Sequence, residues 1–237
     1  MIFTTKGIVL HAIKYGETSV ISEIYTEDKG MIGFIVSGVR QPNSKLSAGS
    51  VQSLSLVELV AYDNPRGLCR IKEMRLQYVY QDIPFNVIKS GIGMFMAEII
   101  KNTIKEKEEN GALFNFLYDQ FVELDTVKKN YANTPVFFLL KLSQYLGFTP
   151  QREGYKDGFV FNLKEGRFMD VQFCNAECLL PEESKIWHEL LILSSGEFKI
   201  SPPDRRMLMD GLLKYYKYHI ENFPEINSLR ILRELWQ

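Results

Sequence analysis

Side chains that usually carry bond-making chemistry are few in this sequence and lie far apart. Its three histidines, His11, His188 and His219, each fall inside a segment of regularly spaced apolar residues. None has a second histidine or a carboxylate at the spacing that a metal site needs. The sequence also has no glycine-rich phosphate loop and no GxSxG nucleophile motif. We therefore expect no enzymatic activity, and we expect the histidines to be packed or on the surface.

The cysteines do not form a metal-binding set either. Cys174 and Cys178 lie in the sequence CNAEC, and Cys69 is far away in an expected strand. Two thiolates do not fill the four positions of a structural zinc site. An odd and sparse set of cysteines predicts no disulfide framework and fits a reducing compartment. We expect a cytoplasmic protein that holds no metal and no other cofactor.

Basic side chains on loops have a chemistry that the sequence does support, which is binding to phosphate. From residue 37 to residue 75 there are six basic residues against three acidic ones. The six are Arg40, Lys45, Arg66, Arg70, Lys72 and Arg75. Lysine and arginine beside exposed aromatic rings suit a phosphate backbone and stacked bases. The alternative is a plain surface of mixed charge. The whole chain has 28 basic and 29 acidic residues, and this balance excludes a wholly basic protein of the histone type but not a local basic surface.

Two further arginines could extend such a surface. Arg205 and Arg206 open a predicted helix, where exposed backbone amides also favour anions. The rival interpretation is that they pair with Asp204, Asp210 or other acids where two parts of the chain meet. The sequence leaves both open.

The elements that must position these residues divide into strands and then helices. Up to about residue 80, runs of β type alternate with turn signals, which predicts a small closed barrel. The runs cover residues 6–13, 19–26, 31–39, 52–63 and 68–76. Gly33, inside the third run, predicts a bulge or bend. A change of phase in the fourth run, from apolar residues 54 and 56 to 57, 59 and 61, predicts another bulge.

Beyond Pro84 the apolar period changes from two to about 3.6, which predicts helices. We expect them over residues 85–104 and 113–124, and then from Thr134, as N-cap, to Gly147. The third of these is apolar nearly all round and should be buried. An irregular insert at about 148–180 contains an expected hairpin of 159–163 and 167–171, and closing helices cover 181–194, 202–222 and 227–235. Several helix lysines fall off the apolar faces and are expected to be exposed, namely Lys89, Lys101, Lys105, Lys128 and Lys141.

Several short motifs occur along the chain, namely GIVL, the YGE turn, the TEDKG turn, GVRQPNSKL, a later RIKE and the ending HIENFPEINSLRILREL. In this order and spacing they resemble the RecO family of bacterial recombination mediators and DNA repair proteins. The resemblance covers essentially the whole chain. It implies an α+β protein with an OB-fold nucleic-acid-binding barrel over 1–80 and a helical domain over 81–237.

The resemblance also implies a function and partners that the residues alone do not supply. RecO-like proteins bind single- and double-stranded DNA and anneal complementary strands. They bind the acidic C-terminal tail of the single-stranded-DNA-binding protein and, with RecR, help to load the RecA recombinase at gaps. We expect these partners, a nucleoid-associated cytoplasmic location and no membrane contact.

This chain departs from the family's pattern in two places. Many members carry a four-cysteine zinc module in the insert, whereas only CNAEC is present here. We therefore predict a metal-free insert held by the packing of Phe159, Phe161 and Phe168. The family's basic loop is often richer, and Gln41 and Asn43 stand in it here. DNA binding by that loop would then depend on Arg40 and Lys45.

Two other classes of function stay open at this point. One is an OB-fold module that binds RNA in translation or RNA decay, and a preference for RNA over DNA of equal sequence would favour it. The other is an adaptor whose barrel binds only protein, for which nucleic-acid affinity should be absent at any salt concentration.

Overall fold

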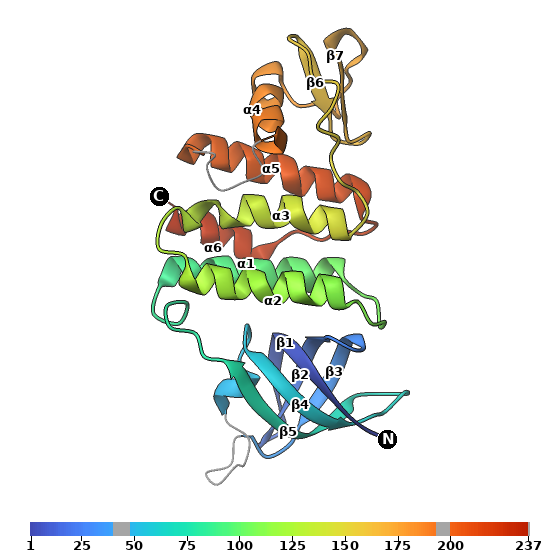
Figure 1. The fold of residues 1–237 in the computed structure, drawn as a ribbon, viewed down its shortest axis with the longest axis vertical. Helices are drawn as coiled ribbons and strands as arrows, with labels where there is room; N and C mark the ends of the chain where they lie inside the picture. The colour runs from blue at the N-terminus through green and yellow to red at the C-terminus, as the bar shows by residue number, and fades with distance from the viewer. Residues whose placement is uncertain (40–47, 193–199, 237) are drawn as a thin grey trace. The chain divides into compact units, whose positions relative to one another are not determined.

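The computed structural model describes residues 1–39, 48–192 and 200–236. Five strands come first, and helices with one two-stranded hairpin follow, so the predicted α+β class is confirmed (Figure 1). The first strands are β1 (Ile2–Tyr15), β2 (Ser19–Thr26), β3 (Gly30–Val36), β4 (Leu56–Tyr62) and β5 (Cys69–Tyr78). A short 3₁₀ turn, η1 (Ala48–Val51), precedes β4. None of the described helices is long and apolar enough to cross a membrane.

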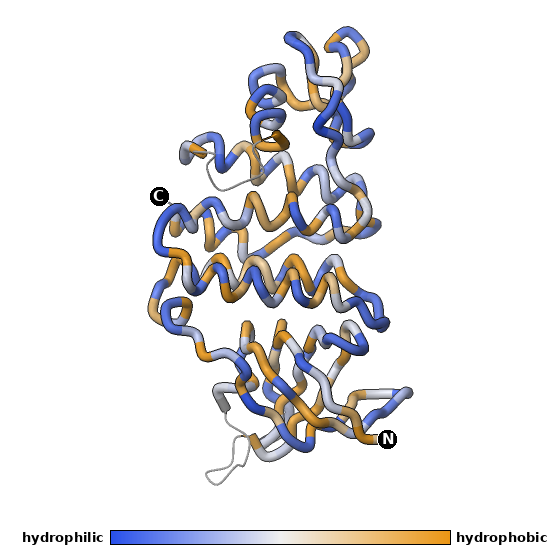
Figure 2. The backbone as a smooth tube through the Cα atoms, viewed as in Figure 1, coloured by the Kyte–Doolittle hydropathy of each residue, from blue (hydrophilic) through white to orange (hydrophobic). Residues whose placement is uncertain are grey.

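The five strands close into a barrel in the order β1-β2-β3-β5-β4. β1 pairs antiparallel with both β2 and β4, and β3 runs parallel to β5, which is the arrangement of an OB-fold. Apolar and polar residues alternate along the strands in Figure 2, because alternate side chains point into and out of the barrel. The interior contains Val9, Ile24, Phe34, Val36, Val57, Leu59, Ala61, Cys69 and Ile71.

The two predicted bulges have different outcomes. Along β4 the register with β5 shifts between Leu56 and Val57, so a bulge at the change of phase is confirmed. At Gly33 a bulge or a bend was predicted; the bulge is excluded, because the β2–β3 register runs past it without a shift, and the bend stays a prediction. A Cβ added to Gly33 would lie 2.7 Å from Leu68 Cδ2. The glycine is there because the β4–β5 loop approaches β3 closely.

The barrel belongs to a compact unit that also contains helices. This unit comprises Met1–Lys129 and Ile226–Leu235, and its helices are α1 (Val87–Thr103), α2 (Gly111–Thr126) and α6 (Asn227–Leu235). The predicted apolar stripe of α1 is confirmed at Ile92, Phe95, Met96 and Ile99, which are buried. Its predicted start at Phe85 is wrong, because Phe85 precedes the helix and is 83% exposed. A boundary near residue 80 between two domains stays a prediction.

The expectation that Lys89 is exposed is wrong. Its side chain is fully buried, forms an ion pair with Asp82 (2.7 Å) and donates to the carbonyl oxygens of Asp125 (2.8 Å) and Val127 (2.6 Å). The two carbonyl groups lie at the end of α2, 36 and 38 residues further along the chain, where spacing along α1 gives no sign of them. Lys89 therefore joins α1 to α2 and is closed to ligands.

The second compact unit comprises Asn130–Glu225 with Trp236. It contains η2 (Tyr131–Asn133), α3 (Thr134–Tyr145), β6 (Phe159–Asn162), β7 (Arg167–Asp170), η3 (Val171–Phe173), α4 (Pro181–Ile192) and α5 (Pro202–His219). Helix α3 begins at Thr134 with Asn133 in the cap position, one residue earlier than predicted. Gly147, at φ +83°, follows its end as predicted.

The β6–β7 hairpin of this unit has the aromatic packing that was predicted for two of three phenylalanines. Phe161 and Phe168 are buried, with ring centroids 5.0 Å apart, and Phe161 also contacts Trp187 at 5.1 Å. Phe159 differs, because it is only half-buried and lies under the ammonium group of Lys156, 5.7 Å from the ring centroid.

Candidate nucleic-acid interface

A row of directly paired residues crosses the outer surface of the barrel. Ile13 pairs with Ile21, Ile21 with Ile35, and Ile35 with Arg70, which in turn pairs with Tyr62. Paired residues lie on the same face of a sheet. Their neighbours in the strands face the core, so this row faces outward. Ile13 and Tyr62 are 48% and 44% exposed, which is unusual for large apolar side chains.

Helices of the same compact unit cover the adjoining part of this face. Tyr25 is buried against Phe114 of α2, with ring centroids 6.2 Å apart, and Glu23 pairs with Lys101 of α1 at 2.5 Å. The Met31 amide donates to the carbonyl oxygen of Glu106 (3.0 Å). The accessible part of the barrel is therefore the row defined above and the β4–β5 side.

Basic side chains gather on that side, but they are not equally available. Arg66, in the β4–β5 turn, and Arg70 are exposed, and their guanidinium groups have no ion pair within the described residues. Lys72 lies 3.2 Å from Glu73 in an exposed pair. Arg75 binds the Glu58 carboxylate through Nε at 2.6 Å. Exposed ion pairs are worth only about 0–1 kcal/mol, so these pairs do not exclude a phosphate.

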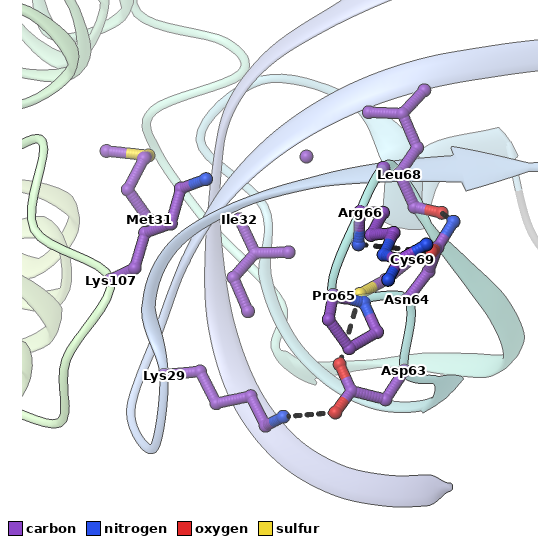
Figure 3. Close-up of a pocket in the computed structure, with 12 residues that line it drawn as sticks. Lys29, Met31, Ile32, Asp63, Asn64, Pro65, Arg66, Leu68, Cys69 and Lys107 are labelled. Atoms are coloured by element: carbon purple, nitrogen blue, oxygen red, sulfur yellow. Dashed lines mark hydrogen bonds and ion pairs between the residues drawn. The ribbon is translucent and has the colours of Figure 1, made fainter.

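The β4–β5 turn also forms one wall of a pocket of about 660 Å³ (Figure 3). Lys29, in the β2–β3 turn, reaches Asp63 across it (2.9 Å), and its ammonium group lies 4.4 Å from the ring centroid of Phe3. The hydrogen bond from Lys29 lowers the pKa of Asp63, which also accepts a weak hydrogen bond from Cys69 Sγ (3.7 Å). Asp63 is therefore ionised and already neutralised by Lys29.

The remaining residues predicted for the site have different surroundings. Arg40 and Lys45 lie outside the described residues. Arg206 is exposed, whereas Arg205 is 8% exposed, donates to Asn133 Oδ1 (3.0 Å) and lies over the ring of Trp236 at 4.9 Å. Burial and then the nearby Arg206 lower the pKa of Arg205. Within the described part of the chain its partners are an amide and an aromatic ring, rather than Asp204 or Asp210.

The three histidines have the settings that the sequence predicted. His11 is exposed on β1. His188 stacks on Tyr155, with ring centroids 4.1 Å apart, and burial lowers its pKa. His219 Nε2 lies 3.1 Å from the Leu163 carbonyl oxygen.

Cys174 and Cys178 are unpaired thiols in a turn of the insert. Burial and then a hydrogen bond with Cys174 raise the pKa of Cys178 to about 11, which opposes the thiolate form that binds metals. Among residues 1–39, 48–192 and 200–236, no three His, Cys, Asp or Glu side chains are grouped so that they could hold a metal ion.

Of the residues that line the pocket, only Arg66 was predicted as a site residue; Lys29, Lys107 and Leu68 are among those that were not. Lys107 lies in an EKEE run that is typical of a solvated helix end. Lys29 lies in a turn, and its partner Asp63 is 34 residues further along the chain. The predicted fold itself could have indicated the pocket, because in an OB-fold the loop between strands 4 and 5 borders the ligand-binding face.

Comparison with known proteins agrees with this architecture. The family model described as "Recombination protein O N terminal" matches residues 1–80, and "Recombination protein O C terminal" matches residues 84–153. The chain is similar to "DNA repair protein RecO" of Phocaeicola vulgatus, at 33% identity over all of both chains. It is likewise similar to proteins of that name from Bacteroides fragilis (33%) and Christiangramia forsetii (35%), again over all of both chains. This likeness shows that the chain belongs to the RecO family of DNA repair and recombination proteins.

Proposed function

We propose that this protein binds single- and double-stranded DNA and anneals complementary strands. The observation that carries the proposal is the outward row of Ile13, Ile21, Ile35, Arg70 and Tyr62, which places exposed apolar and aromatic side chains beside an exposed guanidinium group. Apolar and aromatic surfaces contact bases without regard to sequence, and arginine neutralises phosphate.

Annealing follows from that neutralisation. Two complementary strands repel one another through their phosphates, and a protein that neutralises one backbone lowers this repulsion. Contacts to phosphates leave the base-pairing edges free for the second strand. The process needs no bond-making residue and no nucleotide hydrolysis.

The predicted contacts enter this proposal in two groups. Arg66, Arg70 and Lys72 of the first compact unit and Arg206 of the second are exposed, and Arg40 and Lys45 stay in the proposed set. Arg75 and Arg205 stay in the proposed set, but each would have to leave its present partners to contact a phosphate.

The partners come from the family resemblance. We propose that the protein works in the cytoplasm with RecR, that it binds the acidic tail of the single-stranded-DNA-binding protein, and that it thereby helps RecA to load at gaps. The half-buried or exposed lysines Lys101, Lys105, Lys128 and Lys141 are available for an acidic tail, whereas Lys89 is not.

Fluorescence anisotropy of a labelled single-stranded oligonucleotide across a salt series tests the binding. We expect affinity to fall with salt, and Arg70→Ala/Lys72→Ala to reduce the log–log slope by about 1.4, or about 0.7 for each phosphate that is no longer neutralised. The weakening should be equal for unrelated sequences, and Lys129→Ala/Lys185→Ala, at exposed positions without a proposed role, should leave the slope unchanged. Absence of binding at low salt would leave the adaptor alternative, and tighter binding to RNA of the same sequence would favour the RNA-binding alternative.

A further inference from the structure

The pocket beside the β4–β5 turn carries an excess of positive charge. Its lining has three cationic side chains, Lys29, Arg66 and Lys107, and one carboxylate, Asp63. The ion pair at 2.9 Å joins Lys29 to Asp63, so these two cancel. Arg66 and Lys107 form no ion pair within the described residues. A ligand of this pocket is therefore expected to be anionic.

Its walls between these charges are apolar. Met31 and Ile32 of β3 and Pro65 and Leu68 of the β4–β5 turn belong to its lining. Leu68 packs directly on Gly33 of β3, because a Cβ there would lie 2.7 Å from Leu68 Cδ2. A volume of about 660 Å³ lies within the usual range for pockets that take small organic groups. The ligand should therefore combine an apolar, flat body with negative charge.

We infer that this pocket takes one unstacked nucleotide of a single DNA strand. The base lies against the apolar side chains of the lining, Leu68 and Ile32 among them, and the phosphates on its two sides are held by Arg66 and Lys107. Figure 3 shows Ile32 between Lys107 on one side and the loop that carries Arg66 on the other, as this arrangement requires. The inference rests on the proposed DNA binding and adds to it a specific site.

Polar groups at the rim suit the edge of a base. Asn64 donates to the Leu68 carbonyl oxygen (3.3 Å) and accepts from the Arg66 amide (3.3 Å), so its side chain holds the turn open rather than filling the pocket. Asp63, held by Lys29, presents carboxylate oxygens that accept from an amino group of a base.

The consequence is a preference for single strands. A base that is paired in a duplex has its partner strand beside it and does not enter a pocket between two walls. Residues outside the pocket, such as Arg70 and Lys72, contact phosphates of either form. The pocket therefore adds affinity for single-stranded DNA alone.

An oligonucleotide with a single 2-aminopurine tests this site, because this base fluoresces more strongly when it is unstacked. The described residues that line the pocket include no aromatic side chain, so the bound base should brighten severalfold when the native protein is added. Gly33→Leu, which fills the pocket without changing its charge, should abolish the brightening. Arg66→Ala/Lys107→Ala should weaken binding of single strands and reduce its log–log salt slope by about 1.4, because two phosphates are no longer neutralised. Affinity for duplex should change much less.

The matched control is Lys129→Ala/Lys185→Ala, which removes the same charge from exposed positions outside the pocket. It should keep both the brightening and the single-strand preference. Circular dichroism establishes that each variant is folded, and the arginine–lysine variant tests the site even if Gly33→Leu does not fold.

The possible outcomes separate the two proposals. If the native protein binds no DNA at low salt, the proposed function fails. If it binds DNA but 2-aminopurine does not brighten, or the pocket variants bind single strands as tightly as the control, the nucleotide site alone is refuted. Tight binding of an acidic peptide that does not displace DNA from the protein would assign the pocket to a protein partner instead.

Discussion

Asp125, near the end of α2, holds the segment that joins β5 to α1, and its replacement is a direct test of the fold. Its side chain is 1% exposed. The carboxylate accepts hydrogen bonds from the backbone amides of Gln81 (2.9 Å), Asp82 (2.8 Å) and Ile83 (2.9 Å), and from the hydroxyl of Tyr78 (3.0 Å). One carboxylate therefore fixes three consecutive residues of the connection.

The expected cost of Asp125→Asn follows from these four bonds. A carboxamide keeps one acceptor oxygen, which still serves Asp82 and Ile83, but it turns an NH₂ group toward the Gln81 amide. Tyr78 adapts by rotating its hydroxyl, whereas the Gln81 amide is left without an acceptor. An unpaired buried donor costs about 1–3 kcal/mol, and hydrogen bonds to a charged group are worth about 1.5–3 kcal/mol. We expect the free energy of unfolding to fall by about 3 kcal/mol.

The pH dependence has a definite sign. Burial alone would raise the pKa of Asp125, but the hydrogen bonds from Gln81, Ile83 and Asp82 outweigh it and the pKa lies below its ordinary value of 3.8. A group with a lowered pKa in the folded state stabilises the fold above its unfolded pKa and ceases to do so as pH falls through the folded value. The difference between native protein and Asp125→Asn should therefore be full at pH 7 and shrink below pH 3.8.

Hydrogen exchange is the right assay, since both tryptophans belong to the other compact unit and their fluorescence does not report on this one. In Asp125→Asn the amides of residues 81–83 should exchange about a hundredfold faster, as expected for a loss of about 3 kcal/mol. Urea unfolding followed by circular dichroism gives the global value. Asp119→Asn, an exposed change on the same helix, is the control. A variant within 1 kcal/mol of the native protein would refute this account.

Two further predictions concern contacts inside the same compact unit. Glu98 of α1 accepts a hydrogen bond from the Ser228 amide (2.8 Å) at the start of α6. Burial alone would raise the pKa of Glu98, but its hydrogen bonds with Ser228 and Asn227 lower it. Glu98→Gln should therefore lower the free energy of unfolding in urea by about 1 kcal/mol at pH 7 and leave it unchanged well below pH 4.5. An equal cost at low pH would contradict this. Gly30, at φ +62°, packs against the Glu106 carbonyl oxygen, so Gly30→Ala should lower the melting temperature and the free energy of unfolding, the latter by about 2 kcal/mol. The control is Gly111→Ala, whose added methyl group meets nothing within 4 Å and should not destabilise the protein. Equal stability of the two variants would exclude the contact.

The barrel was predictable because its signal is local. Alternation of apolar and polar residues along a strand depends only on which face is buried, and the change of phase in β4 showed the bulge at Leu56 and Val57 directly. The α1 stripe was predictable for the same reason. Gly33 was misinterpreted because the atom that it accommodates, Leu68 Cδ2, belongs to a loop that is distant in the sequence.

The charged residues were harder to place, since exposure and partners depend on the tertiary fold. Lys89 and Arg205 resemble other surface cations in their sequence neighbourhood, yet one is buried on Asp82 and two carbonyl groups and the other on Asn133. The cations of the pocket differ from these two buried residues, because they remain accessible to a ligand. Lys29 and Lys107 have ordinary solvated surroundings in the sequence, and only the closed barrel brings them to the same cavity.

The β2–β3 turn connects these observations. Lys29 forms an ion pair with Asp63, Gly30 lies close to the backbone of Glu106, and the Met31 amide donates to the Glu106 carbonyl oxygen beside Lys107. Both sides of the pocket are thus fixed to one turn, although they are far apart in the sequence. Because Lys107 follows α1, the DNA-binding surface that we propose is not confined to the barrel. A barrel cut away at residue 80 would lose one of the two cations assigned to the flanking phosphates, and it should bind single strands more weakly even if it folds.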